Sequence, residues 1–277
     1  DTIANRLGEI AARNPEAIVP YSYGGTMGYV QSEGMAARFL NRLGASQLDR
    51  TICASAGGAA MKATYGAGVG MEVENTQDAK VIVIWGSNPI TSSVHFWRRA
   101  QEAKRKGATL IAIDPYRSLS AEKCQQHIAL LPGTDAALAL GLIHIWVREN
   151  WLDHAYIAAH TIGFDALKQR AEHYSPETVA QICGITVESI EQLAKLMGHT
   201  AVVEQQPVAI RLSYGMQRIR GGGNAVRAIA CLPSLLGAWK HPAGGMLLSS
   251  SGFFPVNKHL ERPDLLRKTP RIINMSC

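Results

Sequence analysis

The chain has 277 residues, of which 47% are hydrophobic and 18% are charged. A chain of this length and apolar content can bury a full core and has room for two domains, so these numbers exclude a disordered protein. Lysine and arginine total 28 against 22 aspartates and glutamates, and this mild excess is scattered along the sequence. Such a distribution suits an anionic ligand and does not indicate nucleic-acid binding.

Cysteine spacing and hydropathy further limit the classes of protein to which the chain can belong. No two cysteines form a CxxC pair, so no local motif encodes an iron–sulfur cluster or a zinc knuckle, and most thiols are expected to be free and buried. No apolar run reaches the roughly 20 residues of a membrane span. The chain opens on Asp1 without a charged-then-apolar leader, and its localisation, bacterial cytoplasm or periplasm, stays open.

Taken in chain order, the first segment combines a helix, a strand and a loop. Ile3, Leu7 and Ile10 recur at helical spacing, which predicts a helix over residues 2–13. Residues 17–22 form a short apolar run that predicts a strand. This run leads into a glycine-rich loop at residues 23–28.

The next elements form a strand–helix–strand unit. Residues 81–85 are a continuous apolar run, which is typical of a strand covered on both faces. After a Gly-Ser-Asn-Pro turn, a basic amphipathic helix is predicted over residues 94–106, with Gly107 in a helix-ending position. Residues 109–113 make the following strand. The length of this unit, about 34 residues, indicates a right-handed βαβ crossover and parallel pairing.

The middle of the chain is predicted to be mostly helical. A long apolar helix should span about residues 136–147, and shorter helices follow to about residue 198. A strand over residues 208–212 then leads into a glycine-rich run at 221–223 and a helix that reaches about residue 236. With no fixed-period repeat, the pattern favours a layered α/β architecture built on a parallel sheet. The last strand-like residues, 272–273, stand at the end of an irregular tail, and we expect the natural chain to continue there.

Three loops follow predicted strands and carry groups suited to a nucleotide. Gly86-Ser87-Asn88 lies between a strand and a helix, where main-chain N–H groups and the helix dipole can receive a phosphate. Asp114 and Asp135, on two further loops, can accept hydrogen bonds from a ribose diol or a purine. Each loop alone is equally well explained as a turn or a cap. Together, at one edge of the predicted sheet, they favour a nucleotide-containing ligand.

A simple nicotinamide-binding fold is the competing interpretation, because residues 66–70 superficially resemble its glycine fingerprint. The fingerprint should follow a strand, whereas this run precedes one and has the wrong spacing. No helix can start from it before Val81. We therefore interpret residues 66–70 as a loop.

Four motifs in series resemble the molybdopterin oxidoreductases of the dimethyl sulfoxide reductase, formate dehydrogenase and nitrate reductase group. These are WGSNP at residues 85–89, IDP with Arg117 at 113–117, PGTDA at 132–136 and YGMQ at 214–217. Each motif is weak, but their order and the intervening helices make a joint signal that covers nearly the whole chain. The resemblance implies Rossmann-like parallel-sheet layers, with one α/β domain inserted in another.

The cofactor implied by the resemblance is molybdenum or tungsten held by two molybdopterin guanine dinucleotides. Two loops match positions that contact the phosphates and guanosine of one pterin, and the loop at Asp114 matches a position that reads its nucleoside. The YGMQ loop matches one near the pterins and the metal. The assigned cofactor-binding residues are Gly86, Ser87, Asn88, Asp114, Pro115, Arg117, Gly133, Thr134, Asp135, Gly215, Met216 and Gln217.

Cys53 occupies the place where many family members carry a Cys, selenocysteine, Ser or Asp that ligates the metal. A soft thiolate suits molybdenum or tungsten, so the resemblance assigns Cys53 as metal ligand and catalytic residue. The alternative is a small buried thiol beside a helix start. Arginines around the glycine-rich run could pair with phosphates or a substrate oxyanion, or simply face solvent; these are Arg218, Arg220 and Arg227. Three histidines are expected to be packed or surface residues: His95, His127 and His144.

The family usually has a cysteine-rich iron–sulfur module upstream and a β-rich domain downstream, and this sequence contains neither. We expect residues 70–205 to form an inserted pterin-guanine-dinucleotide-binding domain, and residues 1–69 with 206–277 to form a split, incomplete first domain. Any iron–sulfur cluster is expected only in the missing N-terminal part, and the chain alone is expected to be inactive. The implied partners are a small-molecule substrate and an iron–sulfur electron-transfer protein.

In the complete protein, the resemblance implies a two-electron redox step, either oxygen-atom or hydride-type transfer, on a small substrate. Two alternatives stay open. One is a non-catalytic scaffold in an electron-transfer complex, against which Cys53 and the phosphate loops argue. The other is a non-redox hydratase on the same cofactor.

Overall fold

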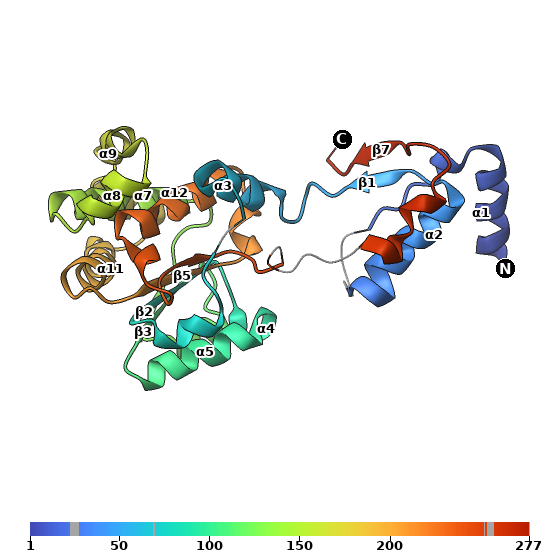
Figure 1. Ribbon diagram of the computed structural model, residues 1–277. Helices are drawn as coiled ribbons and strands as arrows, with labels where there is room; N and C mark the ends of the chain where they lie inside the picture. Colours follow the sequence, from blue (N-terminus) through green and yellow to red (C-terminus); the bar gives the residue numbers. More distant parts are fainter. Residues whose placement is uncertain (23–27, 69, 252, 254–257, 277) are drawn as a thin grey trace. The chain divides into compact units, whose positions relative to one another are not determined.

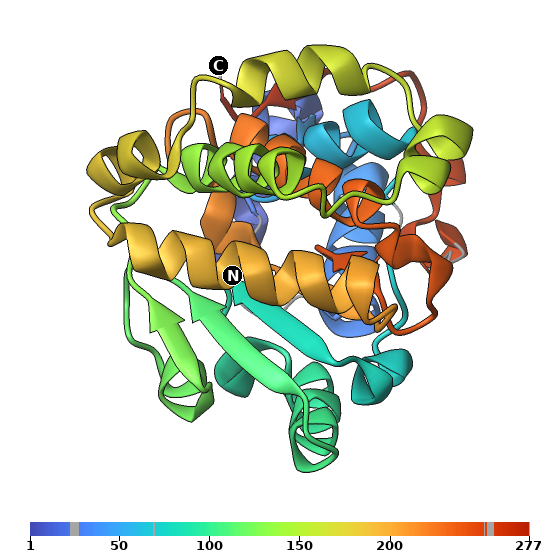
Figure 2. The ribbon, with the colours of Figure 1, turned by 90° about the vertical axis from the view of Figure 1, so that its left-hand side faces the viewer.

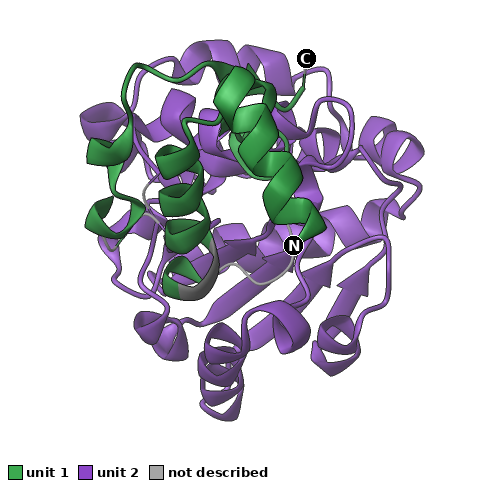
Figure 3. Cartoon of the chain, turned by 90° about the vertical axis from the view of Figure 1, so that its right-hand side faces the viewer, with its two compact units in different colours: residues 1–55, 253–277 green, residues 56–252 purple. Residues whose placement is uncertain are grey.

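The computed structural model describes residues 1–22, 28–68, 70–251, 253 and 258–276 (Figure 1). The chain divides into two compact units, which Figure 3 shows in different colours. The first unit comprises residues 1–55 and 253–277, and the second comprises residues 56–252. The second unit is therefore inserted between two parts of the first.

A five-stranded, wholly parallel sheet forms the centre of the second unit, in the order β4-β3-β2-β5-β6. Its strands are β2 (Val81–Trp85), β3 (Thr109–Ile113), β4 (Gln126–Ile128), β5 (Val208–Leu212) and β6 (Gly245–Leu247). The predicted strands at 81–85, 109–113 and 208–212 are confirmed. The parallel pairing predicted between the first two is also confirmed. These apolar runs form strands because both faces of the sheet are covered, which suits continuous Val and Ile runs.

Helices cover the sheet on both faces, as Figure 2 shows. The helices of the second unit, including the one that begins at its first boundary, are α3 (Ser55–Tyr65), α4 (Pro89–Ser92), α5 (Val94–Arg105), α6 (Leu119–Lys123), α7 (Asp135–Arg148), α8 (His154–His160), α9 (Phe164–Ala171), α10 (Pro176–Cys183), α11 (Val187–Gly198) and α12 (Gly222–Leu235). Alpha-7 is buried along most of its length, which its almost uninterrupted apolar sequence requires. The predicted helical middle section is thus confirmed. Residues 66–68 and 70, interpreted as a loop, form neither helix nor strand.

Short 3-10 and π-helical segments lie between the main elements of the second unit. They are η3 (Glu74–Asp78), η4 (His199–Val203), η5 (Tyr214–Gln217) and η6 (Ala238–Lys240). Polar side chains at Ser175 and Thr186 cap α10 and α11 by accepting hydrogen bonds from main-chain N–H groups in the first turn. Gly184, with a φ of 68°, ends α10 in the left-handed conformation that glycine adopts most easily.

The described residues of the first unit form two α-helices and a two-stranded parallel sheet. Its elements are α1 (Thr2–Arg13), η1 (Pro15–Ala17), η2 (Tyr29–Gly34), α2 (Met35–Leu43), β1 (Gln47–Asp49), η7 (Lys258–Glu261), η8 (Pro263–Leu265) and β7 (Ile272–Asn274). Beta-1 pairs with β7, so the two parts of this unit are joined by main-chain hydrogen bonding. The first helix and the strand-like residues 272–273 are as predicted.

The strand predicted at residues 17–22 is wrong. Residues 15–17 form a 3-10 turn, and residues 18–22 have no regular structure. Pro20 stands in the middle of this run, and a proline lacks the N–H that a central strand position donates. The glycine-rich loop predicted to follow falls on residues 23–28, of which 23–27 lie outside the described residues.

The boundaries of the two units differ from the division expected at residues 70 and 205. Beta-5 and β6 lie beyond residue 205, yet β5 pairs with β2 along its whole length, and β6 pairs with β5. These strands therefore complete one sheet with the βαβ unit. Main-chain pairing between segments more than 100 residues apart sets this boundary, and no local pattern reports it.

Candidate functional site

The order of the sheet places a switch point, where the direction of strand addition reverses, between β2 and β5 at the carboxyl edge. The chain proceeds from β2 outward through β3 to β4 and then returns to place β5 on the other side of β2. At such a reversal the helices that follow the two adjacent strands leave in opposite directions. The space outside the strand ends is where ligands bind in open parallel sheets. In this chain the loops after β2 and β5 meet there.

Those two loops touch through residues that the sequence singled out. Gly86 has a φ of 57°, in the left-handed region, and its N–H donates to the Ile113 carbonyl at 2.8 Å. A side chain at Gly86 would meet Met216 at 3.5 Å, and one at Gly215 would meet the Gly86 oxygen at 3.4 Å. Glycines at these two positions therefore let the loops approach closely.

Ser87 has an unusual hydroxyl. The residue is only 5% exposed, and its Oγ finds no hydrogen-bond partner among the described residues. A buried polar group without a protein partner is rare, and a bound ligand or an ordered water can supply the partner. Asn88 next to it is already engaged, because its side-chain oxygen accepts from the Ser120 hydroxyl at 2.7 Å. Within this loop, Ser87 is the residue that fits a phosphate.

Asp114 follows β3 and shapes the next loop. Its N–H donates to the Ile128 carbonyl at 3.1 Å, and its Oδ1 accepts from the Tyr116 N–H at 2.9 Å. The His127 ring is hydrogen-bonded to the Asp114 carbonyl at 2.8 Å, so this histidine has a structural partner. Burial raises the pKa of the Asp114 carboxyl, while the Tyr116 hydrogen bond acts in the opposite direction. Pro115 and Arg117 are exposed on the same loop.

Asp135 is placed differently from the expectation of an open acceptor on a loop. It is 8% exposed, it is the first residue of α7, and its Oδ1 accepts from the Trp85 indole N–H at 2.9 Å. Burial raises the pKa of Asp135, and the charge of Asp114 raises it further. The two carboxylates are therefore near enough to interact. The turn before Asp135 is formed by Gly133 and Thr134. Gly133 has a φ of 90°, and the Thr134 hydroxyl donates to the Leu131 carbonyl.

Gln217 turns back toward α3, where its Oε1 accepts a hydrogen bond from the Gly57 N–H. Beside it lies a groove of about 440 Å³ between α3 and the start of α12. The groove is lined mainly by alanines and glycines, together with the larger side chains of Gln217, Ile219, Asn224 and Arg227. The small residues are Ala56, Ala59, Ala60, Ala63, Gly221, Gly222 and Gly223. Such a surface admits a flat ligand close to the main chain.

Sequence reasoning missed the contribution of α3 to this groove. The alanines recur at helical spacing and give a stripe of small residues, which is visible in the sequence. Of the three arginines proposed to face phosphates, Arg227 lines the groove, while Arg218 and Arg220 are exposed on the neighbouring loop.

Cys53 lies in the first unit, in the segment between β1 and α3, and is partly buried. The four loops belong to the second unit. The role of Cys53 as a metal ligand therefore stays a prediction. No group of three or more His, Cys, Asp or Glu side chains in the described part of the chain is arranged to hold a metal ion. His95 is exposed, and His144 is hydrogen-bonded to the Ala171 carbonyl.

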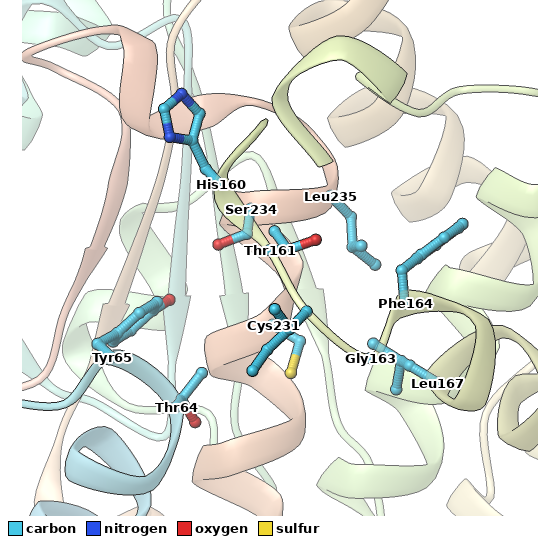
Figure 4. A pocket seen from close by; sticks show the side chains of 11 residues that line it. Thr64, Tyr65, His160, Thr161, Gly163, Phe164, Leu167, Cys231, Ser234 and Leu235 are labelled. Atoms are coloured by element: carbon cyan, nitrogen blue, oxygen red, sulfur yellow. The ribbon is translucent and has the colours of Figure 1, made fainter. Parts of the chain in front are cut away.

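A separate cavity of about 180 Å³ lies between α3, α8, α9 and α12 (Figure 4). In its lining, the hydroxyls of Thr64 and Thr161 and the thiol of Cys231 donate to main-chain carbonyls one turn earlier. Tyr65 likewise donates to the Ala230 carbonyl. Burial raises the pKa of the Cys231 thiol, so it stays protonated at neutral pH. Because these donors are used internally and no described lysine or arginine lines the cavity, it does not suit a phosphate.

Comparison with known proteins shows the family of the chain. Residues 1–258 match the family model described as molybdopterin oxidoreductase. The chain is 40% identical over its whole length to "Probable oxidoreductase YoaE" of Bacillus subtilis, covering 40% of that protein. It is 33% identical to the F420-dependent formate dehydrogenase subunit alpha of Methanocaldococcus jannaschii, over 64% of this chain and 26% of that one.

A solved structure shares the fold. Acetylene hydratase from Pelobacter acetylenicus superposes with a TM-score of 0.65 at 24% identity, over 87% of this chain and 32% of that one. The match to the family model defines the class of protein, one whose members hold molybdenum or tungsten in a pterin cofactor. The chain belongs to the molybdopterin oxidoreductase family. It spans about two fifths of the length of YoaE and less of the other two proteins. Among the described residues, no helix is both long and apolar enough to cross a membrane.

Proposed function

We propose that this chain is the central cofactor-binding part of an oxidoreductase that uses molybdenum or tungsten held by two molybdopterin guanine dinucleotides. The complete protein carries out a two-electron redox step, by oxygen-atom or hydride-type transfer, on a small substrate. The observation that carries this proposal is the unpartnered, buried Ser87 hydroxyl at the carboxyl edge of the sheet, where the loops after β2 and β5 meet. A phosphate accepts the hydrogen bond that Ser87 lacks.

Each loop binds a different part of the cofactor, according to the groups that the loop carries. Main-chain N–H groups near Gly86 and the Ser87 hydroxyl bind phosphate oxygens, and Thr134 with Gly133 forms the neighbouring turn. Asp114 accepts hydrogen bonds from the ribose or guanine, because its carboxylate lies at the end of β3.

The pterin lies in the groove beside Gln217, where alanine and glycine leave space for a flat ring system. When bound, the cofactor supplies a redox-active metal, and this chain binds and orients it. In the complete protein, electrons leave through an iron–sulfur partner.

Metal and nucleotide analysis of the natural full-length protein tests this proposal directly. The protein is expressed in a host that makes the molybdenum cofactor, and elemental mass spectrometry is combined with acid release of GMP. We expect one molybdenum or tungsten and about two GMP per chain. A well-folded protein with neither would contradict the proposal and favour a scaffold role. A protein with both, but no redox turnover with artificial electron carriers, would favour a hydratase.

The same assay tests the nucleoside contact at Asp114. We expect Asp114→Ala to lower the released GMP toward one per chain, since one of the two guanosines loses its carboxylate acceptor. Glu122→Ala, on the exposed side of α6, is a matched control that removes a carboxylate without touching the edge of the sheet. Equal GMP content in the two variants would remove Asp114 from the site.

Cys53 provides a test that does not depend on turnover. If its thiolate ligates the metal, Cys53→Ala in the full-length protein loses the metal–sulfur contribution of a protein thiolate in the X-ray absorption spectrum. Cys124→Ala is the control, because burial raises the pKa of that thiol to about 11 and keeps it protonated. An unchanged spectrum in Cys53→Ala would show that Cys53 is not a ligand.

A further inference from the structure

One arginine of the central sheet has no role in the site described so far. Arg211 is the fourth residue of β5, and its neighbours Ile210 and Leu212 face the main core. The alternation of a strand therefore places Arg211 on the opposite face, where its guanidinium lies 5.5 Å from the ring centre of Phe96. Phe96 belongs to the first turn of α5.

The guanidinium of Arg211 is held at the carboxyl edge of the sheet. Its Nη1 donates to the carbonyls of Leu247 at 3.1 Å and Leu248 at 2.7 Å. Leu247 ends β6, and Leu248 is the first residue beyond it. Two main-chain contacts and one aromatic ring thus fix the orientation of the group beside the first turn of α5. That turn contains no acidic residue, and its N-cap side chain makes no capping hydrogen bond.

The charge of Arg211 is not balanced within the described residues. Its Nε is buried and has no hydrogen-bond partner there. Its Nη2 is not one of the buried unpartnered atoms, and it also makes no hydrogen bond to a described residue. Arg211 also forms no ion pair there, in contrast to Arg148, which contacts Glu191 at 2.8 Å. Burial lowers the pKa of Arg211, which reports the cost of keeping the charged form in this environment. A largely buried cation normally requires an anionic partner.

We propose that Arg211 is the cationic anchor of an oxyanion subsite that receives a phosphate group at the carboxyl edge between β5 and the start of α5. The fixed guanidinium presents Nη2, and the uncapped first turn of α5 adds main-chain N–H groups. The ligand class is a pyrophosphate-containing small molecule. The identity of that molecule as a guanine dinucleotide rests on the proposed function. The binding of an anion at Arg211 does not.

Calorimetric titration of cofactor-free full-length protein with inorganic pyrophosphate tests the subsite. We expect Arg211→Met to weaken pyrophosphate binding by about tenfold to a hundredfold, the range for loss of a charge-assisted hydrogen bond. Arg211→Lys, which keeps the charge but not the fork, should fall between wild type and Arg211→Met. Arg105→Met is the matched control, because Arg105 is exposed at the other end of α5. It should change the affinity by less than about twofold.

Equal affinities of Arg211→Met and Arg105→Met for pyrophosphate overturn the proposal, as does a folded wild-type protein that binds no pyrophosphate. If Arg211→Met does not fold by circular dichroism, Arg211→Gln decides, since glutamine can still donate to the Leu247 and Leu248 carbonyls. The outcome is separable from the proposed function. Pyrophosphate binding that requires Arg211, in a protein without metal or GMP, supports the subsite alone. If the full-length protein contains metal and GMP, but its pyrophosphate binding does not depend on Arg211, the results support the proposed function alone.

Discussion

Gly222→Ala is expected to lower the free energy of unfolding by about 1–3 kcal/mol, the usual cost of forcing extra volume into a packed site. A Cβ at Gly222 would lie 2.5 Å from the Cα of Gln217 and 2.8 Å from its carbonyl carbon. These are main-chain atoms, so no flexible side chain can move aside. The YGMQ loop must shift, and with it Gly215, which packs against the Gly86 oxygen. We therefore also expect less GMP to be retained by Gly222→Ala in the full-length protein.

Gly58→Ala is the matched control and should act in the opposite direction. Gly58 lies in α3, and a Cβ there would meet nothing within 4 Å. Alanine in a helix is favoured over glycine by about 0.5–1 kcal/mol, so this variant should be more stable than wild type. Urea denaturation of both variants measures the two effects. The same sign for both would show that the close contact at Gly222 is not the cause.

Asp135→Ala is the second substitution with a large expected effect, a loss of about 1–3 kcal/mol of stability. Trp85 is fully buried, and Asp135 provides the acceptor for its indole N–H. Alanine leaves this donor without a partner in the core, whereas asparagine at the same position would keep a side-chain oxygen in place. Asp135→Asn should therefore retain most of the stability. If both variants lose the same amount, the hydrogen bond to Trp85 is not what stabilises this region.

The pH dependence of Asp135→Asn gives an independent check. Burial, assisted by Asp114, raises the pKa of Asp135 in the folded protein above its unfolded value of about 3.9. A carboxyl group shifted in this direction binds more protons when folded. Its favourable contribution is thus complete below the unfolded pKa and is lost as the pH rises through the folded pKa. As the pH rises from about 4 through the folded pKa of Asp135, the Asn variant should lose less stability than wild type in denaturant titrations. Parallel profiles would contradict the shift.

Several elements were predictable because their signals are local. The runs at Val81–Trp85, Thr109–Ile113 and Val208–Leu212 are mostly or wholly apolar, and strands covered on both faces need that composition. The apolar length of α7 indicates a buried helix in the same way. The loops at Gly86, Asp114 and Gly215 were predictable from their positions after these strands, since parallel strands bring their carboxyl ends to one edge.

Other features depended on partners that are distant in the sequence. Whether residues 17–22 become a strand depends on pairing, and Pro20 lacks the N–H for it; the first unit instead pairs β1 with β7. The side chain of Asp135 is engaged by Trp85, fifty positions earlier. No pattern around Asp135 distinguishes that role from an open loop acceptor. Arg211 is similar, because its environment is made by Phe96, Leu247 and Leu248.

The sequence by itself determined the fold class, the main strands of the sheet, the family and the loops that end those strands. Each of these depends on residue types within one short segment, where hydrophobic periodicity and turn chemistry act directly. Only the tertiary structure decided the unit boundaries, the unpartnered hydroxyl of Ser87, the groove beside Gln217 and the fixed guanidinium of Arg211. These features arise when segments remote in the chain are packed together, because burial and the presence of a partner are properties of that packing.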